Sequence, residues 1–145
     1  MKQASIPALA CMCASFRRAA RALTQEYDRA LRPAGLRATQ FTVLQALSLT
    51  GEIAQGNLGD LLALDSTTLT RTLRIMRRQG WIEERPGKDR RERLLRLGAR
   101  GRAQMERALP AWEEAQTRVR RLLGDRRWQA SLQDANDLAR ALAKV

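Results

Sequence analysis

The spacing of apolar residues between positions 58 and 97 limits the fold of this chain more than any other feature of its sequence. Leu58, Leu61 and Leu62 have helical spacing, and we expect them to face inward from a short helix that Asn57 caps. Gly59 weakens this helix slightly but permits the close approach of a neighbouring element. The first part of the segment therefore predicts a short helix packed closely against its neighbour.

A second helix and a hairpin follow directly. The helix has Asp65 or Ser66 as its N-terminal cap and ends at Gly80, because glycine readily adopts the left-handed conformation. After Gly80 come a strand-like stretch, a turn and a returning strand, over residues 81–85, 86–89 and 91–97. The segment thus predicts helix, turn, helix and β-hairpin in that order.

The rest of the chain is predicted to be helical. Apolar residues recur at helical spacing in four further stretches, which are residues 6–31, 39–50, 99–123 and 127–143. Pro110 should kink the third of these helices, and residues 52–54 are too short to assign beyond a stub of strand. No stretch of about twenty residues lacks charge, so we expect no membrane segment. The predicted fold class is mainly α, with one short β-hairpin.

Positive charge is concentrated in one region. The chain of 145 residues has a net charge of +12, and residues 71–107 contribute +8 of it, with thirteen Lys and Arg against five Asp and Glu. Clustered cations favour a polyanionic partner, because neutralised phosphates release counterions. An anionic membrane surface and a merely solvated coat are the alternatives, and the focused distribution favours nucleic acid.

The second helix of the segment has two chemically different faces. At 100° per residue, Leu73 and Met76 lie within about 40° of Leu69, and these three side chains should pack. The opposite side carries a hydroxyl and three cations, which are Thr67, Arg71, Arg74 and Arg78. A helix with such a face fits the major groove of DNA, where Arg can bind guanine. A solvated basic face on an ordinary amphipathic helix is an equally weighted alternative for this helix alone.

The hairpin shifts that balance toward DNA. Lys88, Arg90, Arg91 and Arg93 crowd its tip and return strand, where a loop can enter a narrow minor groove that attracts arginine. The carboxylate of Asp89 is placed to hold the Arg91 guanidinium by a charge-assisted bond. Asp89 can equally serve to make the turn, which is a favoured role of aspartate.

The segment from residue 58 to residue 101, LGDLLALDSTTLTRTLRIMRRQGWIEERPGKDRRERLLRLGARG, resembles the MarR family of bacterial regulators. Its marks are the hydroxyl-rich start of the second helix, the Thr70-Arg71 pair, the exit over residues 78–81 and Asp89-Arg90-Arg91 before a leucine-rich strand. The order of helices on either side matches the family over essentially the whole chain. Gly98 is a departure, because the family usually has threonine there to cap the next helix.

The resemblance implies a homodimer on a pseudo-palindromic operator in double-stranded DNA, with two recognition helices in successive major grooves and two wings in the flanking minor grooves. We expect residues 36–98 to form a winged helix-turn-helix DNA-binding lobe. Residues 1–35 and 99–145 would form the helical dimerisation region of a single domain, residues 1–145. The predicted DNA contacts lie on the second helix and the hairpin tip and are Ser66, Thr67, Thr68, Thr70, Arg71, Arg74, Arg78, Lys88, Asp89, Arg90 and Arg91.

Two cysteines provide a candidate sensing site. Cys11 and Cys13 are too close for an ordinary intrachain disulfide, and without histidine or a third thiol they make a metal site improbable. The spacing of Cys13 and Tyr27 resembles the branch of the family that responds to organic hydroperoxides, although Arg37-Ala38-Thr39-Gln40-Phe41 lacks the second tyrosine of that branch. Arg17 and a nearby helix N-terminus would favour the thiolate. Burial of both cysteines as small apolar residues is the alternative.

The sequence therefore predicts a cytoplasmic DNA-binding regulator of transcription, namely a repressor that a small aromatic or anionic ligand, or thiol oxidation, releases from DNA. A non-specific architectural nucleic-acid-binding protein is the alternative function. An enzyme is the weakest candidate, because the chain has no histidine, no Gly-rich phosphate loop and no convergent carboxylates. We expect no cofactor and no metal, and we expect the aromatic residues Phe16, Phe41, Trp112 and Trp128 to pack rather than bind ligand.

Overall fold

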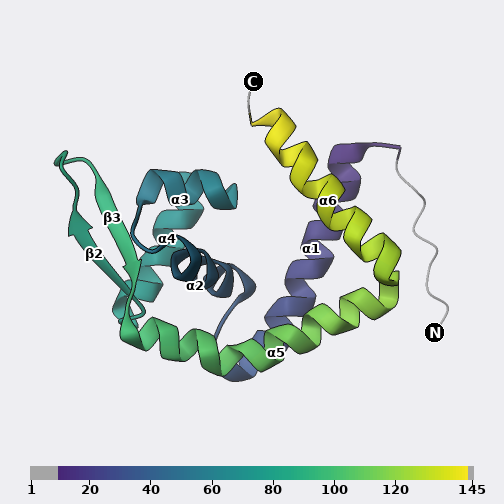
Figure 1. Ribbon diagram of the computed structural model, residues 1–145, viewed down its shortest axis with the longest axis horizontal. Coiled ribbons are helices and arrows are strands. Elements are labelled where there is room, and N and C mark those ends of the chain that lie inside the picture. Colours follow the sequence, from purple (N-terminus) through teal and green to yellow (C-terminus); the bar gives the residue numbers. More distant parts are fainter. Residues whose placement is uncertain (1–9, 144–145) are drawn as a thin grey trace.

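The computed structural model describes residues 10–143. Its elements are, in chain order, α1 (Met12–Leu31), η1 (Arg32–Ala34), α2 (Ala38–Thr50), β1 (Ile53–Ala54), α3 (Gln55–Leu62), α4 (Ser66–Arg78), β2 (Ile82–Pro86), β3 (Arg93–Leu97), α5 (Ala99–Leu123) and α6 (Asp125–Leu142). Helices α2 to α4 and the sheet form one lobe, α1 and α6 lie on the other side of the molecule, and α5 runs from the base of the hairpin to α6 (Figure 1). This arrangement confirms the predicted fold class, a mainly α chain with a winged helix-turn-helix.

The sheet has three antiparallel strands in the order β1-β3-β2. Strands β2 and β3 form the wing, with Ile82 opposite Leu97 and Pro86 opposite Arg93. The short β1 pairs with the outer edge of β3 and so fixes the wing to the loop between α2 and α3. The pairing with β1 therefore joins the hairpin to the helical lobe along its β3 edge, and β2 forms the other edge of the sheet.

The core of the lobe lies where α2, α3, α4 and the sheet meet. Phe41, Leu44 and Leu47 come from α2, and they are buried together with Leu58 of α3 and Leu95 of β3. From α4, the three side chains predicted to pack, Leu69, Leu73 and Met76, are all buried. Phe41 also stacks on Trp112 of α5, with ring centroids 5.7 Å apart, so the packing expected of these two aromatic residues is present. The core thus fixes which face of α4 stays outside.

Helix α5 matches its predicted bounds and continues through Pro110. Gly98 occupies its N-cap position without a side-chain hydrogen bond, and the helix still begins at Ala99. Two other helix starts differ from prediction by more than two residues. Cys11 is extended, and α1 begins at Met12 rather than residue 6; residues 6–9 of the predicted helix lie outside the described residues. Asn57 is not a cap, because the chain passes from β1 straight into α3 at Gln55.

The inward face of α3 also differs in part from prediction. Leu58 is fully buried and Leu62 packs against the core, but Leu61 is 56% exposed. Gly59 is buried too, so the inward direction lies between Leu58 and Gly59. Leu62 projects about 40° from Leu58 toward that direction, whereas Leu61 projects about 60° from Leu58 on the opposite side. The predicted close approach at Gly59 is present, because an added Cβ would lie 3.3 Å from Leu69 Cδ2.

Apolar side chains remain exposed on the helices outside the lobe. Met12, Phe16 and Leu23 of α1 are exposed in the single chain, as are Leu122 of α5 and, on α6, Leu132, Leu138 and Leu142. Helix α6 has no buried residue and packs against α5.

Within residues 10–143, the structure contains no helix with the length and apolar character needed to cross a bilayer.

Candidate nucleic-acid interface

Helix α4 begins at a strong N-terminal cap. A carboxylate oxygen of Asp65 accepts a hydrogen bond from the Thr68 amide at 2.9 Å, and the other accepts one from the Thr68 hydroxyl at 2.6 Å. These bonds to the charged carboxylate hold the pKa of Asp65 below its usual range, with the hydroxyl bond the largest cause. At the other end, Gly80 has a φ of +69°, as expected for the residue after a helix. Both predicted ends of α4 are therefore confirmed.

The outer face of α4 carries the residues that the sequence placed there. Its hydroxyl and arginine side chains are all exposed, and they are Ser66, Thr67, Thr68, Thr70, Arg71, Arg74 and Arg78. Five of these residues surround a shallow hollow of about 320 Å³, namely Ser66, Thr67, Thr70, Arg71 and Arg74. Because the apolar face is locked into the core, this polar face can meet a partner without any rearrangement of α4.

The tip of the wing is an exposed turn that carries Lys88, Asp89, Arg90 and Arg91. Asp89 closes this turn, because its side-chain oxygen accepts a hydrogen bond from the backbone N–H of Arg91 at 3.1 Å and its carbonyl accepts one from Glu92 at 3.0 Å. The prediction that Asp89 holds the Arg91 guanidinium is therefore wrong. The amide two residues along is the donor closest to an aspartate in a turn, so it takes the carboxylate.

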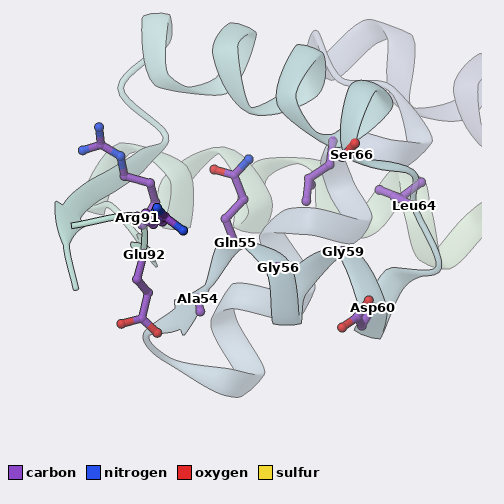
Figure 2. A pocket seen from close by; sticks show the side chains of 11 residues that line it. Ala54, Gln55, Gly56, Gly59, Asp60, Leu64, Ser66, Arg91 and Glu92 are labelled. Carbon is purple, nitrogen blue, oxygen red and sulfur yellow. The ribbon is translucent and has the colours of Figure 1, made fainter. Parts of the chain in front are cut away.

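A second hollow, of about 450 Å³, separates α4 from the wing. Figure 2 shows Arg91 and Glu92 on its wing side, Gln55, Gly56 and Gly59 of α3 along its floor, and Ser66 at the start of α4 on the far side. The hydroxyl-rich start of α4 and the cations of the wing tip thus lie on either side of one open groove.

The arginines of the lobe fall into two classes. Those on the stem of the wing and at its contact with the rest of the lobe are ion-paired: Arg85 with Glu52, Arg96 with Glu83, and both Arg77 and Arg93 with Glu84. In the described residues, the cations of the outer face of α4 and of the wing tip form no ion pair; these are Arg71, Arg74, Arg78, Lys88, Arg90 and Arg91. The free cations are the predicted contact residues, and they face outward.

The pair between Glu52 and Arg85 ties β1 to the wing. Arg85 Nε donates to Glu52 Oε2 at 2.7 Å, and Arg85 Nη2 donates to Glu52 Oε1 at 2.5 Å, so the contact is bidentate. The hydrogen bond from Arg85 lowers the pKa of Glu52, and the same bond raises the pKa of Arg85. Glu52, Glu83 and Glu84 therefore neutralise arginines of the wing stem and of its contact with α4, which leaves the unpaired positive charge on the outer face of α4 and on the wing tip.

Comparisons with known proteins agree with this geometry. A family model described as the MarR family matches residues 36–92. The crystal structure of the M. tuberculosis transcriptional regulator MosR in complex with DNA is 40% identical, with a TM-score of 0.82, and the match covers 92% of this chain and 97% of that one. The chain belongs to the MarR family.

This MarR-family chain is similar to two further proteins, a curated relative and a solved structure. The uncharacterized HTH-type transcriptional regulator YwoH of Bacillus subtilis (strain 168) is 33% identical over 78 residues, which are 54% of this chain. The chain spans 57% of the length of this curated relative. A mutant MarR from E. coli complexed with operator DNA shares the fold, with a TM-score of 0.75 and 23% identity over 87% of this chain and 91% of that one.

The two cysteines lie at the start of α1, far from the outer face of α4 and the wing tip (Figure 1). Both are free thiols and both are exposed, so the alternative that both cysteines are buried does not hold in the single chain. Cys13 lies in the first turn of α1, and Arg17 Nη2 lies 3.7 Å from its Sγ, one turn along as expected. Tyr27 is about 21 Å farther along the same helix, at 1.5 Å per residue. Within one chain Tyr27 donates to Gln116 instead, and burial raises its pKa.

A third hollow, of about 760 Å³, lies behind the MarR-family lobe, where the α4–β2 turn and the η1 segment meet the start of α5. Arg100 and Arg107 line it, and neither has a carboxylate partner in the described part of the chain. Buried Gln104 donates to the Ala34 carbonyl at 2.5 Å and accepts a hydrogen bond from Arg107. Trp81 adds an aromatic wall.

Among the described residues, no group of three or more His, Cys, Asp or Glu is placed to hold a metal ion.

Sequence reasoning missed the acids that organise the interface. Glu52, Glu83 and Glu84 each hold an arginine in the structure. A signal for one of them is present in the hairpin, because Glu83 faces Arg96 directly across the two strands. Glu52 pairs with Arg85 and Glu84 pairs with Arg77 across different elements, and the spacing of residues within one element does not predict these ion pairs.

Proposed function

We propose that this protein is a dimeric, sequence-specific DNA-binding regulator of transcription. The observation that carries the proposal is the separation of paired from unpaired arginines, because within the described helix-turn-helix and wing the cations without an ion pair lie on the outer face of α4 and on the wing tip. Two copies of α4 would enter successive major grooves of a pseudo-palindromic duplex, and the wing tips would enter the flanking minor grooves. The M. tuberculosis relative MosR was solved in complex with DNA, which supports DNA as the partner.

The outer face of α4 suits the major groove for a chemical reason. Arg71 and Arg74 can bind guanine through paired donors, whereas the hydroxyls of Thr67 and Thr70 suit phosphate oxygens or base edges. At the wing, Arg91 projects from a turn that Asp89 makes rigid. A narrow minor groove has an enhanced negative potential, which attracts such an arginine without reading a specific base.

A dimer explains the exposed apolar side chains of α1 and α6. The apolar side chains of Phe16, Leu23, Leu132 and Leu138 are exposed in the single chain, and a partner chain would bury them. Sedimentation of the protein should give the mass of two chains, and Leu132→Asp with Leu138→Asp should give one chain and weaken operator binding. A monomer that binds the operator with full affinity would contradict the dimer.

A gel shift tests the proposed function. The protein should bind a segment of DNA upstream of its own or a neighbouring gene more tightly than random duplex, in the presence of excess competitor. Equal affinity for both duplexes, with the same salt dependence, would instead identify a non-specific architectural protein. Because the proposed partner is chromosomal DNA, the protein would act in the cytoplasm.

We propose that the regulator is a repressor and that a small aromatic anion releases it. The hollow between Arg100, Arg107 and Trp81 supports this choice, because unpaired guanidinium groups beside an indole suit a carboxylate on an aromatic ring. The hollow touches the end of α4, so an occupant can shift the recognition helix. Benzoate should release DNA from wild-type protein and not from Arg100→Gln; equal release from both would contradict this site.

Thiol oxidation is a second candidate signal, and the exposure of Cys13 beside Arg17 supports it. The thiolate would attack the terminal oxygen of an organic hydroperoxide, so that the O–O bond breaks, sulfur gains this OH group as sulfenic acid, and the alkoxide leaves as an alcohol after it takes a proton from water. Treatment with cumene hydroperoxide should release wild-type protein and Cys11→Ser from DNA but leave Cys13→Ser bound. Release of all three proteins, or of none, would remove Cys13 from the mechanism.

A further inference from the structure

Glu84 lies between the two elements that face DNA in the proposed function. It stands in the middle of β2, and its carboxylate reaches in two directions. Oε2 lies 2.6 Å from Nε of Arg77 in the last turn of α4, and Oε1 lies 3.5 Å from Nε of Arg93 at the start of β3. The Glu84 side chain is only 20% exposed, so water screens these contacts less than it screens the other ion pairs of the wing.

The neighbouring acid, Glu83, makes a different kind of contact. Its side chain projects to the opposite face of β2, pairs with Arg96 directly across the hairpin at 2.6 Å, and is 51% exposed. Both members of this ion pair therefore belong to the wing. In the described part of the chain, the contact of Glu84 with Arg77 is the ion pair that joins α4 to the hairpin.

We propose that Glu84 is a positioning residue that fixes the angle between the wing and α4, so that both contact one duplex at the same time. The inference rests on the proposed function, and it adds a residue that touches no DNA. When two linked contacts are held at the spacing of their two sites, the second contact costs less entropy, and the affinity of the whole rises. Loss of the ion pair would let the wing sample other angles.

Charge and positioning predict opposite effects of Glu84→Gln, which makes the inference testable. The substitution removes a negative charge near DNA and frees two arginines. Electrostatics alone therefore predicts tighter binding and a steeper salt dependence. Positioning predicts weaker binding to the operator. Glu83→Gln changes the charge by the same amount on the same strand, and it leaves the contact between α4 and the wing intact, so it is the matched control.

The experiment uses two duplexes and fluorescence anisotropy. One is the duplex that the wild-type protein selects from a random-sequence pool, and the other keeps its two major-groove half-sites but lacks the flanking minor-groove segments. Glu84→Gln should bind the full duplex about fivefold more weakly than wild type and the shortened duplex no more weakly. Glu83→Gln should bind both duplexes at least as tightly as wild type.

A third variant links the effect to Arg77. If Glu84 acts through Arg77, then Arg77→Gln should show the same loss on the full duplex, and the double variant should lose no more than either single variant. Thermal melting monitored by circular dichroism checks that each variant is folded at the binding temperature. A variant that is unfolded there is replaced by Glu84→Asp, whose shorter side chain should give the same selective loss on the full duplex.

The outcomes separate the inference from the function on which it rests. If wild-type protein selects no preferred duplex, the proposed function fails. If wild-type protein does select one, and Glu84→Gln then matches Glu83→Gln on both duplexes, the positioning role of Glu84 is overturned. Equal losses on the full and the shortened duplex would overturn it as well, because they would place the effect of Glu84 in α4 alone.

Discussion

Gly101 packs against the carbonyl group of Trp81 so closely that a Cβ atom at position 101 would lie 2.8 Å from the Trp81 carbonyl carbon and nearer still to its oxygen. The same oxygen accepts a hydrogen bond from the amide of Gly98 at 2.9 Å. The start of α5 is therefore seated on the backbone that connects α4 to the wing. Any side chain at position 101 would have to move one of these elements.

We predict that Gly101→Ala destabilises the protein by about 1–3 kcal/mol, because overpacking against backbone cannot relax by a change of rotamer. Urea denaturation followed by circular dichroism measures the loss. Gly56→Ala is the matched control, since nothing lies within 4 Å of an added Cβ there. It should be neutral or stabilising by up to about 1 kcal/mol. Equal stability of Gly101→Ala and wild type would contradict the packing described here.

Arg71 should read a base. It is exposed on the outer face of α4 and forms no ion pair in the described residues, so its donors are free. We predict that Arg71→Ala costs about 1–3 kcal/mol of operator binding and removes the preference at one base position of each half-site. Binding to a set of operators with single base changes measures both effects. Arg126→Ala on α6 removes the same charge and should change neither; a sequence-blind loss for Arg71→Ala would show that Arg71 touches only phosphate.

Arg91 should act through the minor groove and through charge. Its position on the wing tip predicts that Arg91→Ala weakens binding by a similar factor on every duplex. The slope of log affinity against log salt concentration should become shallower by about one, because one fewer phosphate is neutralised. Titrations at a series of salt concentrations measure this slope. An unchanged slope together with a lost base preference would contradict this role and would show that Arg91, like Arg71 in our proposal, reads a base.

The cap at Asp65 predicts a pH-dependent contribution to the stability of α4. Because the pKa of Asp65 is lowered in the folded protein, its contribution to stability is complete above the pKa of an unfolded aspartate, about 3.9, and is lost as the pH falls through the lowered value. Asp65→Ala should therefore reduce the melting temperature at neutral pH, and its difference from wild type should shrink as the solution is acidified.

Asp60→Ala is the control for that experiment. Asp60 is also exposed and lies nearby on α3, but its side chain does not cap a helix. It should leave the melting temperature close to that of wild type across the same pH range. A difference between Asp65→Ala and wild type that does not change down to the lowest pH would show that the charged carboxylate is not what stabilises the start of α4.

Much of this fold could be predicted from the sequence, because α4 and the wing have strong local signals. The helical spacing of Leu69, Leu73 and Met76 determines which face of α4 is buried, and every cation on the opposite face is exposed as a direct consequence. Gly80 and Asp65 determine the two ends of the same helix. Local periodicity and capping were sufficient wherever a helix is long enough to bury a full stripe of side chains.

The remaining features depend on contacts between distant segments. Asn57 has the chemistry of a cap, but the pairing of β1 with β3 sets the start of α3 two residues earlier. The partners of Glu84 are seven and nine residues away in two other elements. The pairing of β2 with β3 brings Arg93 near Glu84, and the packing of the wing on α4 brings Arg77 there. Asp89 had two plausible partners in sequence, and the turn geometry selected the backbone amide of Arg91.

Protection of guanine N7 from dimethyl sulfate in the protein–DNA complex shows whether the unpaired arginines of α4 read a specific operator. We expect two protected clusters in the major groove, related by twofold symmetry and about one helical turn apart, because two copies of α4 would lie in successive grooves. Arg71→Ala should lose protection at the same guanine in both clusters. Uniform protection along the duplex, or none in the major groove, would contradict the claim that the unpaired arginines of α4 read a specific operator.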